Sequence, residues 1–585
     1  MKSFLKYFLA CLLAIIVFGI ISMFFFMGLA GAAMSGAVPK VGNNSVLVID
    51  LSHNYEEQPL TDMQTIIREE SIEDKPGLYN VIRLIQKAKK DEKISGIYIV
   101  ANTNINGFAT SDEIRAALED FKSSKKFVIA YGDVMSQKAY SVANMADKIY
   151  VSPKGFFEWT GYSVNLMFIK GTLDKLEIKP QIFYAGKFKS ATEPLRATEM
   201  TEPNKLQTAA WMNELYANLL HNTAIQRKLD TAILHHLADN GSVQTPQDAV
   251  TNKLIDGAWY DDEVKDEIKK QLKLDSTEKI NFLSIEKYAS VHRDFSSKGD
   301  NIALIYASGD IVDGKGGEGK IGSENYVNLI RKARLDKDIK AIVLRVNSGG
   351  GSALASENIW REMTLAKKEK PVIVSFGDVA ASGGYYISCA ADSIFASPNT
   401  ITGSIGVFGI IPDMSVFFKN KLGITFDGVA TGPLANTGNI DHPMNEQEKK
   451  LIKGQIERIY TDFKERVAEG RKKDTAYIET IAQGRVWTGF RGKEIGIVDA
   501  FGGLEDAIKA AARMAKLKEF NVKEYPKQAN LFERILGIQE EETSISKKMK
   551  EELGIEYYNV YKQLQQVKEM TNKAQTKLPF EFVIN

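Results

Sequence analysis

The chain has 585 residues, of which 44% are hydrophobic and 25% charged, so it is long enough for several domains of ordinary globular composition. Its formal net charge of +1 provides no overall attraction for nucleic acid, and we expect no nucleic-acid partner. Two cysteines exclude a disulfide framework and a thiolate metal site. No other cluster of metal ligands is evident in the sequence, so we predict neither a metal nor a cofactor.

The first predicted element is an apolar N-terminal segment. Residues 7–38 contain no charged side chain, and residues 8–29 are rich in Leu, Ile, Val, Phe and Met, enough for the ~20 residues that span a bilayer. Because Lys2 and Lys6 precede this segment, the positive-inside rule predicts a single-pass anchor with the rest of the chain outside the cytoplasm. A cleaved signal peptide, processed near residues 30–32, is the alternative, but its apolar core would be only about 7 to 15 residues long.

Beyond residue 40 the chain repeats itself. The sequence IQKAKKDEKISGIYIV at residues 85–100 matches IRKARLDKDIKAIVL at residues 330–344, and the stretches after Gly132 and Gly377 match in the same way, each pair 245 residues apart. We interpret these matches as two tandem copies of one α/β unit, in which buried strands alternate with amphipathic helices. The polar stretch at residues 275–300 is predicted to include the junction between them.

This interpretation divides the chain into four parts. The predicted parts are a cytoplasmic tip and anchor (1–39), a first repeat (40–295), a second repeat (296–540) and a C-terminal helical extension (541–585).

The first repeat carries two lysines in an unusual setting. Lys187 and Lys189 lie in the sequence GKFKSATEP at residues 186–194, between a β-like run at residues 180–184 and a polar helical region. Most lysines are solvated surface charges, but a desolvated lysine near a helix N-terminus can be neutral at working pH and can act as a base. The local sequence leaves both interpretations open.

The second repeat contains a glycine-rich loop. Residues 341–346 are predicted to form a buried parallel strand, which runs into the sequence NSGGGS at residues 347–352 before a polar helical segment. Three successive glycines, Gly349 to Gly351, allow the backbone to approach a ligand and to present its amides. A phosphate site is the weaker alternative, because no Gly-Lys-Ser/Thr follows and the GxGxxG spacing is absent.

Ser382 lies at the next transition from strand to helix. A β-rich run at residues 371–376 breaks at Gly377, and after a short turn helix-compatible residues follow Ser382. A hydroxyl at a helix start can attack a carbonyl while the unpaired N–H groups receive the developing oxyanion. More commonly, a serine at a helix start only caps the helix.

Comparison of the two repeats separates these interpretations. Moving back 245 residues from Ser382 leads to Gln137, and moving back from the three glycines leads to Asn-Ile-Asn at residues 104–106. Features needed only for folding would tend to persist in both copies, whereas joint loss of the hydroxyl and the glycines indicates chemistry at a single site. We therefore predict that Ser382 is a nucleophile. Its base would be Lys189 or His442, the only histidine downstream of it in the second repeat.

Four motifs together resemble a known family. They are ASGGYY around Ser382, NSGGGS at residues 347–352, GSIG at residues 403–406 and GKFKSATEP at residues 186–194. Over about residues 40 to 530 the chain is similar to the membrane-anchored, double-length signal peptide peptidases (protease IV) of bacteria, within the Clp/crotonase-like superfamily. The family's glycine loop usually reads Ser-Pro-Gly-Gly, and this chain has Gly349 in place of the proline.

The resemblance implies a role for each candidate residue. Ser382 would be the nucleophile and Lys189 the general base, while Ser404 would hydrogen-bond the lysine. The oxyanion donors would be the amides of Gly350 or Gly351 and of Gly383. The segment of the second repeat that corresponds to Lys189, residues 430–435, has no lysine, so the dyad would form between the repeats.

The resemblance also implies what the protein acts on and where. It predicts a serine endopeptidase that degrades cleaved signal peptides and other hydrophobic peptides. The enzyme would be a homo-oligomer, a tetramer, anchored in the bacterial inner membrane with its catalytic part on the periplasmic side. Two alternatives are a crotonase-type enzyme that handles acyl-CoA and a catalytically inactive membrane scaffold. An extracytoplasmic position argues against the first, and the intact Ser, Lys and Gly set argues against the second.

Overall fold

The computed structural model describes residues 41–58, 75–292, 298–317, 319–526 and 573–578, together with residue 295 and a few positions between residues 7 and 22. In this described part, no helix combines the length and the apolar character that a membrane crossing requires. The predicted anchor at residues 8–29 lies mostly outside the described residues.

The first repeat is built on a six-stranded parallel sheet in the order β6-β4-β3-β2-β1-β7. The strands are β1 (Ser45–Asp50), β2 (Ile94–Val100), β3 (Phe127–Met135), β4 (Lys148–Phe157), β6 (Gly257–Ala258) and β7 (Asn281–Ser284). Their central members are almost continuously apolar, as expected for parallel strands covered on both faces.

Helices cover both faces of this sheet. On one side they enclose the larger core, and they are α3 (Leu78–Lys90), α4 (Phe108–Lys122), α5 (Gln137–Ala143), α8 (Glu202–Arg227), α9 (Thr231–Asp239), α10 (Pro246–Thr251) and α12 (Ile285–Val291). On the other side, α11 (Asp261–Leu272) packs Val264, Ile268 and Leu272 against the strands.

The second repeat has the same layers around a sheet in the order β17-β15-β13-β11-β8-β19, with β14 and β18 attached to β13. Its strands are β8 (Asp300–Ser308), β11 (Ile339–Ser348), β13 (Val372–Ala381), β14 (Ser393–Ala396), β15 (Ile401–Gly403), β17 (Val486–Thr488), β18 (Ala500–Phe501) and β19 (Phe520–Tyr525). Its helices are α13 (Ser323–Leu335), α14 (Ala353–Lys367), α15 (Gly383–Ser388), α17 (Glu446–Arg471), α18 (Thr475–Ile481), α19 (Gly489–Glu494) and α20 (Leu504–Met514).

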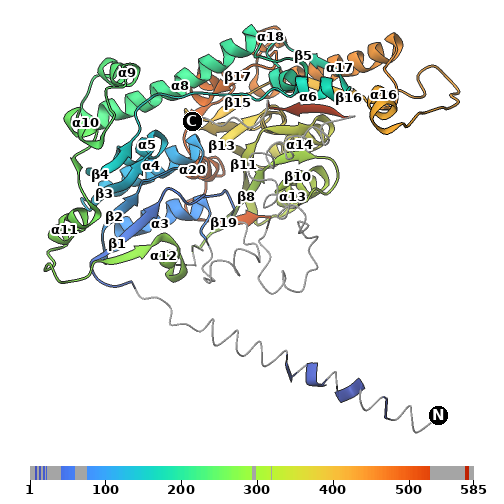
Figure 1. Ribbon diagram of the computed structural model, residues 1–585. Helices are drawn as coiled ribbons and strands as arrows, with labels where there is room; N and C mark the ends of the chain where they lie inside the picture. Colours follow the sequence, from blue (N-terminus) through green and yellow to red (C-terminus); the bar gives the residue numbers. More distant parts are fainter. Residues whose placement is uncertain are drawn as a thin grey trace.

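The predicted tandem α/β repeats are confirmed, and long helices of the two repeats match in length and spacing. Helices α4 and α14 are both 15 residues long and begin 245 residues apart, and α8 and α17 are both 26 residues long. Figure 1 shows the first repeat, in blue to green, beside the second, in yellow to orange, with the long helix α8 running along one side of the molecule.

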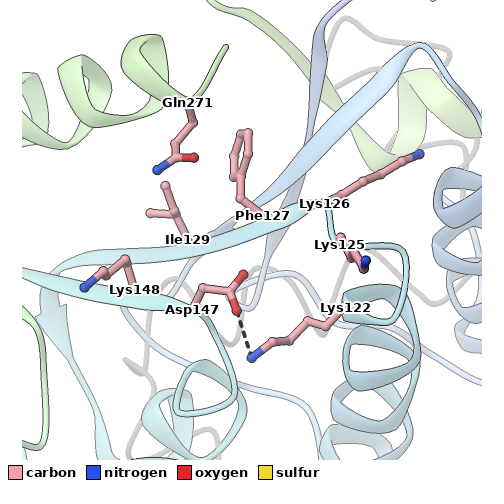
Figure 2. A pocket seen from close by; sticks show the side chains of 8 residues that line it. All are labelled: Lys122, Lys125, Lys126, Phe127, Ile129, Asp147, Lys148 and Gln271. Atoms are coloured by element: carbon pink, nitrogen blue, oxygen red, sulfur yellow. Dashed lines mark ion pairs between the residues drawn. The ribbon is translucent and has the colours of Figure 1, made fainter. Parts of the chain in front are cut away.

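Lysines that cap helix ends also recur in both repeats. Lys122 Nζ donates to the carbonyl of Met145 and Lys367 Nζ donates to that of Ala390, at 2.7 and 2.8 Å. Lys122 lines a half-open cavity of about 350 Å³ on the first repeat, together with Lys125, Lys126, Phe127, Ile129, Asp147, Lys148 and Gln271 (Figure 2). Because the second repeat keeps the same contacts, we assign these lysines to folding rather than to a site.

A third, mixed sheet joins the repeats, in the order β10-β9-β12-β20-β16-β5. It consists of β5 (Lys179–Ala185) from the first repeat, β9 (Asp310–Val312), β10 (Lys320–Gly322), β12 (Gly350–Ser352) and β16 (Val407–Asp413) from the second, and β20 (Ala574–Lys577) from the C-terminal extension. The remaining short helices are α6 (Lys170–Lys175), α7 (Glu193–Arg196) and α16 (Ser415–Phe417), with a 3-10 turn at Ser190–Thr192 and a π-helical turn at Phe418–Leu422.

Two local expectations differ from the structure. The strand predicted to break at Gly377 continues to Ala381, because β15 pairs with residues 379–381 and the Asn347 side chain accepts from the Val379 N–H. The described residues of the predicted C-terminal helix form a strand instead, because β12 and β16 offer it backbone partners on both sides. The remainder of that predicted helix lies outside the described residues.

The repeats meet around a buried guanidinium. Arg345, on β11, is fully buried, and its Nε lies 2.8 Å from Glu57 Oε2 while its Nη2 lies 2.5 Å from Glu113 Oε1. Both carboxylates come from the first repeat, so this charge of the second repeat is paired across the boundary, while its Nη1 donates to Ser375 Oγ and to the Phe376 carbonyl of its own repeat. Removing one partner of such a buried cluster typically costs about 3–5 kcal/mol.

Candidate active site

Ser382 joins the end of β13 to the start of α15, as predicted, in an unusual backbone conformation. Its φ of 55° and ψ of −113° lie in a region that non-glycine residues rarely adopt. Its N–H donates to the carbonyl of Gly403 at 2.8 Å, and its carbonyl accepts from Tyr386 N, also at 2.8 Å. These bonds on both sides hold the strained residue in place.

The Ser382 side chain does not cap the helix. Its hydroxyl makes no hydrogen bond to a backbone N–H of α15, although Ser382 occupies the cap position. In the first repeat, Ser136 does cap the corresponding helix α5, since its Oγ accepts from Ala139 N at 3.1 Å. The Ser382 hydroxyl is therefore available to partners other than its own helix.

Lys189 reaches this place from the first repeat. The strand before it, β5, pairs antiparallel with β16 over seven residues and so extends across the second repeat. Phe188 N then donates to the carbonyl of Gln483 at 2.9 Å. An added Cβ at Gly484 would lie 2.7 Å from the Lys189 backbone N, so only glycine fits against this segment.

The three predicted polar side chains meet in a buried cluster. Lys189 Nζ lies 2.8 Å from Ser382 Oγ, 3.1 Å from the Ser404 carbonyl oxygen and 3.1 Å from Ser404 Oγ. Lys189 is only 1% exposed, and both serines are completely buried. Burial alone holds the pKa of the Lys189 amine well below its ordinary value.

The surroundings of Nζ match a neutral amine. A neutral amine has two N–H groups and one lone pair. Nζ can donate to the Ser404 carbonyl and to Ser404 Oγ, which leaves the lone pair to accept from the Ser382 hydroxyl. An ammonium would place a full charge in this buried cluster, and among the described residues no carboxylate influences the pKa of Lys189.

The predicted glycines lie next to Ser382. Gly350 has φ 100°, and an added Cβ there would lie 2.6 Å from Gly383 N, so the glycine loop and the start of α15 are in close contact. Gly383 is the first residue of α15, where an N–H has no acceptor within its own helix. Gly350 N donates to Ser348 Oγ at 3.1 Å, while Gly351 belongs to β12 and pairs with β20.

Comparison with known proteins identifies the family. The sequence model of peptidase family S49 matches residues 120–275 and again residues 364–518, once in each repeat. The chain belongs to peptidase family S49. It is 36% identical over 474 residues to Protease 4 of Salmonella typhi, covering 79% of this chain and 75% of that protein.

Other S49 relatives are similar over comparable lengths. Protease 4 of Haemophilus influenzae is 33% identical over 470 residues, 77% of this chain and 75% of the relative. The chloroplastic serine protease SPPA of Arabidopsis thaliana is 32% identical over 439 residues, 74% of this chain and 64% of the relative. This S49 peptidase is therefore a serine-type protease.

The other predicted base and the other lysine of this S49 peptidase have different partners. His442 contacts Asp441 at 2.8 Å and Glu448 at 3.5 Å, and these carboxylates raise its pKa. Lys187 is exposed, with its Nζ 5.0 Å from the Phe188 ring centroid. Neither side chain is hydrogen-bonded to Ser382 or Ser404.

One supporting residue of the S49 peptidase was not predicted. Gln207, on α8, donates through Nε2 to the Phe188 carbonyl at 3.0 Å and to Ser190 Oγ at 2.9 Å, and its Oε1 accepts from Val486 N at 3.2 Å. It therefore ties both sides of Lys189 to the second repeat. A lone glutamine in a long polar helix carries no sequence signal for this role.

Proposed function

We propose that this S49 peptidase hydrolyses peptide bonds with a dyad of Ser382 and Lys189, contributed by different repeats. The observation that carries the proposal is the 2.8 Å contact between Lys189 Nζ and Ser382 Oγ at a lysine whose burial favours the neutral form. Ser404 holds Nζ in position through its carbonyl and its hydroxyl.

In the first step, neutral Lys189 takes the proton of the Ser382 hydroxyl as Oγ bonds to the substrate carbonyl carbon. Negative charge then develops on the carbonyl oxygen, where the amide of Gly383 stabilises it together with that of Gly351, or with that of Gly350 once its N–H leaves Ser348 Oγ. The C–N bond breaks, and the lysine ammonium returns its proton to the leaving amine. Water hydrolyses the acyl-enzyme by the same sequence of proton transfers.

The substrates we propose are hydrophobic peptides such as cleaved signal peptides. Support comes from the resemblance of the four motifs to signal peptide peptidases and from the predicted anchor, which would hold the site near the bilayer where such segments remain. Membership of a peptidase family argues against the acyl-CoA alternative. The buried Ser-Lys contact argues against an inactive scaffold.

The location we propose is the bacterial inner membrane, with a single N-terminal span and the catalytic part outside the cytoplasm. Lys2 and Lys6 before the apolar segment support this orientation. Protease added to spheroplasts should reach exposed loops of the enzyme, while protease added to sealed inverted vesicles should not. Protection in spheroplasts would contradict the orientation.

We further propose that the enzyme is a homo-oligomer, a tetramer by its resemblance to the family. The segment of the first repeat around β5 packs Ile178 and Ile182 against apolar residues of β16. The corresponding segment of the second repeat, residues 422–434, forms no strand within the described chain and exposes Phe426 and Val429. Phe426→Asp with Val429→Asp should reduce the sedimentation coefficient of the detergent-solubilised enzyme if a second copy covers this segment.

The direct test of the nucleophile is covalent labelling. An acylating serine-directed probe should add one mass increment to the intact chain, and peptide mapping should place that adduct on Ser382. Ser382→Ala should remain unlabelled under the same conditions. Labelling of another serine in the wild-type chain would overturn the assignment.

A further inference from the structure

Helix α8 of the first repeat lies along β17 of the second (Figure 1). Residues of α8 spaced by about one helical turn, Gln207, Trp211 and Glu214, share the face toward this strand. Gln207 Oε1 accepts from Val486 N at 3.2 Å, and Trp211 packs beside the Val486 side chain. Glu214 accepts a hydrogen bond from Thr488 Oγ1. The helix therefore contacts β17 from one end to the other.

Strand β17 and the residue before it hold the backbone of the proposed site in the second repeat. Gly403 pairs with Val486 between β15 and β17, and the Gly403 carbonyl accepts from Ser382 N at 2.8 Å. Ser404 N donates to the Arg485 carbonyl at 2.7 Å. A displacement of β17 would therefore move Ser382 and Ser404 together.

Gln207 joins the Lys189 segment to the same strand. Its Oε1 accepts from Val486 N, as described above, and its Nε2 faces the first repeat. The acceptors of Nε2 are the Phe188 carbonyl at 3.0 Å, Ser190 Oγ at 2.9 Å and Asn204 Oδ1 at 3.1 Å. The side chain is only 2% exposed. One buried amide thus connects the residues on both sides of Lys189 to the strand that holds Ser382.

A buried carboxylate determines which way this amide faces. Glu193 is 1% exposed, and it accepts from Asn204 Nδ2 at 2.9 Å while Arg196 lies 3.6 Å away. Because a carboxylate only accepts hydrogen bonds, Asn204 turns its Nδ2 toward Glu193 and its Oδ1 toward Gln207. Gln207 then presents Nε2 to Asn204 and Oε1 to Val486. The charge on Glu193 therefore sets the direction of the whole chain of amides.

We propose that Gln207, with its amide oriented by Asn204 and Glu193, is a positioning residue that holds Lys189 Nζ at Ser382 Oγ. This inference rests on the proposed dyad and adds a support to it. Within the described chain these three side chains do not hydrogen-bond Lys189 Nζ or Ser382, so they act through the backbone on both sides of Lys189. The dyad needs such a support because its base and its nucleophile belong to different repeats.

Loss of the amide leaves polar groups unpaired beside Lys189. In Gln207→Leu the Phe188 carbonyl and the Val486 N–H each lose a partner at nearly constant side-chain volume. Buried polar groups without partners are costly, and ordered water satisfies them where it can enter. Water at this place would reduce the desolvation of the Lys189 amine.

Reduced desolvation has a defined effect on Lys189. The charged side chains around its segment are Lys187, Glu193, Arg196 and Arg485. Among the described residues none of them shifts the pKa of Lys189, which burial alone lowers. Entry of water therefore raises this pKa toward its ordinary value. A smaller fraction of the enzyme then carries the neutral amine at neutral pH.

The experiment measures hydrolysis of a fluorogenic peptide across pH by the full-length enzyme and by Gln207→Leu. The variant should lower kcat at neutral pH by about tenfold with KM within about twofold, and the midpoint of its kcat/KM profile should move to higher pH by about 0.5–1 unit. Gln226→Leu, the same substitution at the other end of α8, is the matched control and should behave as wild type. A loss that is equal at every pH, with an unchanged midpoint, would overturn the proposal.

A second variant acts at the far end of the chain of amides. Glu193→Gln keeps the side-chain volume but no longer forces Asn204 and Gln207 to face one way, so its midpoint should also move to higher pH, by less than in Gln207→Leu. Loss of the negative charge by itself would favour the neutral amine and move the midpoint to lower pH. The direction of the shift therefore distinguishes lost positioning from lost charge. If Gln207→Leu does not fold, Glu193→Gln decides, and an unchanged or lower midpoint overturns the role of Glu193.

A stability measurement separates this proposal from the proposed dyad. Lys189→Met should raise the Tm at neutral pH, because it removes a buried amine, and should raise it less in a Gln207→Leu chain, where water reaches that amine. This comparison does not require catalysis. Full hydrolysis by Lys189→Ala would make the dyad wrong, while the two Tm differences would still show whether Gln207 keeps Lys189 buried. Equal Tm gains in both chains would overturn the role of Gln207.

Discussion

The two repeats treat the same position in opposite ways. The second repeat has Ser382 at the start of α15 with its hydroxyl facing Lys189, and the first has Gln137 at the start of α5. Gln137 Oε1 accepts from the N–H groups of Thr160 and Gly161 at 3.0 and 3.1 Å, and Gln137 N donates to Glu158. Where the second repeat has the candidate nucleophile Ser382, the first repeat has a glutamine whose side chain hydrogen-bonds the backbone of the neighbouring loop.

The glycine loop of the second repeat also corresponds to hydrogen-bonding side chains in the first repeat. At the corresponding place in the first repeat, Asn106 Oδ1 accepts from Tyr55 N at 2.8 Å, and its Nδ2 donates to the carbonyls of Leu51 and His53. In the second repeat, glycines replace these side chains. The backbone of the loop can therefore pair directly with β20. The two repeats therefore keep the same layers of strands and helices, although in the first repeat the side chains of Gln137 and Asn106 occupy the positions that correspond to the candidate site.

The largest expected effect is loss of the dyad. Ser382→Ala, Lys189→Ala and Lys189→Arg should each reduce kcat/KM for a fluorogenic peptide by about three orders of magnitude or more, since arginine remains protonated and cannot accept the proton. Lys187→Ala and His442→Ala should keep substantial activity. Full activity in Lys189→Ala, or loss in His442→Ala with Lys189→Ala unharmed, would contradict a dyad between the repeats.

The next effect is on pH dependence. Because burial lowers the pKa of Lys189, kcat/KM should rise tenfold per pH unit up to that lowered pKa and then level off below the ordinary value of roughly 10.4. Between the lowered pKa of the folded state and the ordinary pKa of the unfolded state, Lys189 is protonated only in the unfolded chain. It therefore lowers the free energy of unfolding at neutral pH, and this loss diminishes as pH rises toward the ordinary pKa. Lys189→Met should therefore raise the Tm at neutral pH, and thermal unfolding measured across pH would show the difference shrinking as pH rises.

Ser404→Ala should have a smaller effect. It removes the hydroxyl 3.1 Å from Lys189 Nζ but leaves the carbonyl contact, so we expect kcat to fall by about tenfold with little change in KM. Ser404→Thr should restore part of the loss if the hydroxyl positions the lysine. Equal losses in the two variants would indicate disruption of the backbone at this positive-φ residue instead.

The smallest effect concerns the filled position of the first repeat. Gln137→Ala should leave kcat/KM within about twofold of wild type, because no nucleophile is lost. It should cost about 1–3 kcal/mol of stability, since the N–H groups of Thr160 and Gly161 lose their acceptor. Denaturant unfolding and peptide hydrolysis of the same preparation measure both quantities. A large loss of activity without loss of stability would place chemistry in the first repeat as well.

The repeat architecture and the candidate nucleophile could be predicted from the sequence alone. The 245-residue spacing and the apolar strand patterns required two similar α/β layers, because buried parallel strands and their covering helices impose a local periodicity that residues display directly. The same spacing singled out Ser382 and the glycine loop, since their counterparts in the first repeat are chemically different. The motifs around these residues also indicated the family, which the match to the S49 sequence model confirms.

Only the tertiary structure showed how Lys189, Gln207 and β20 contact the second repeat. Apart from the family resemblance of the motif, nothing in the local sequence distinguishes Lys189 from Lys187. Burial and contact with Ser382 arise because β5 pairs with β16, more than 200 residues away in the chain. Gln207 and β20 are likewise defined by partners far away in the sequence, the first by the backbone on both sides of Lys189 and the second by two open sheet edges. Local sequence specifies hydrogen-bonding periodicity and turns, whereas burial of a charge and pairing of an edge depend on which distant segments the fold brings together.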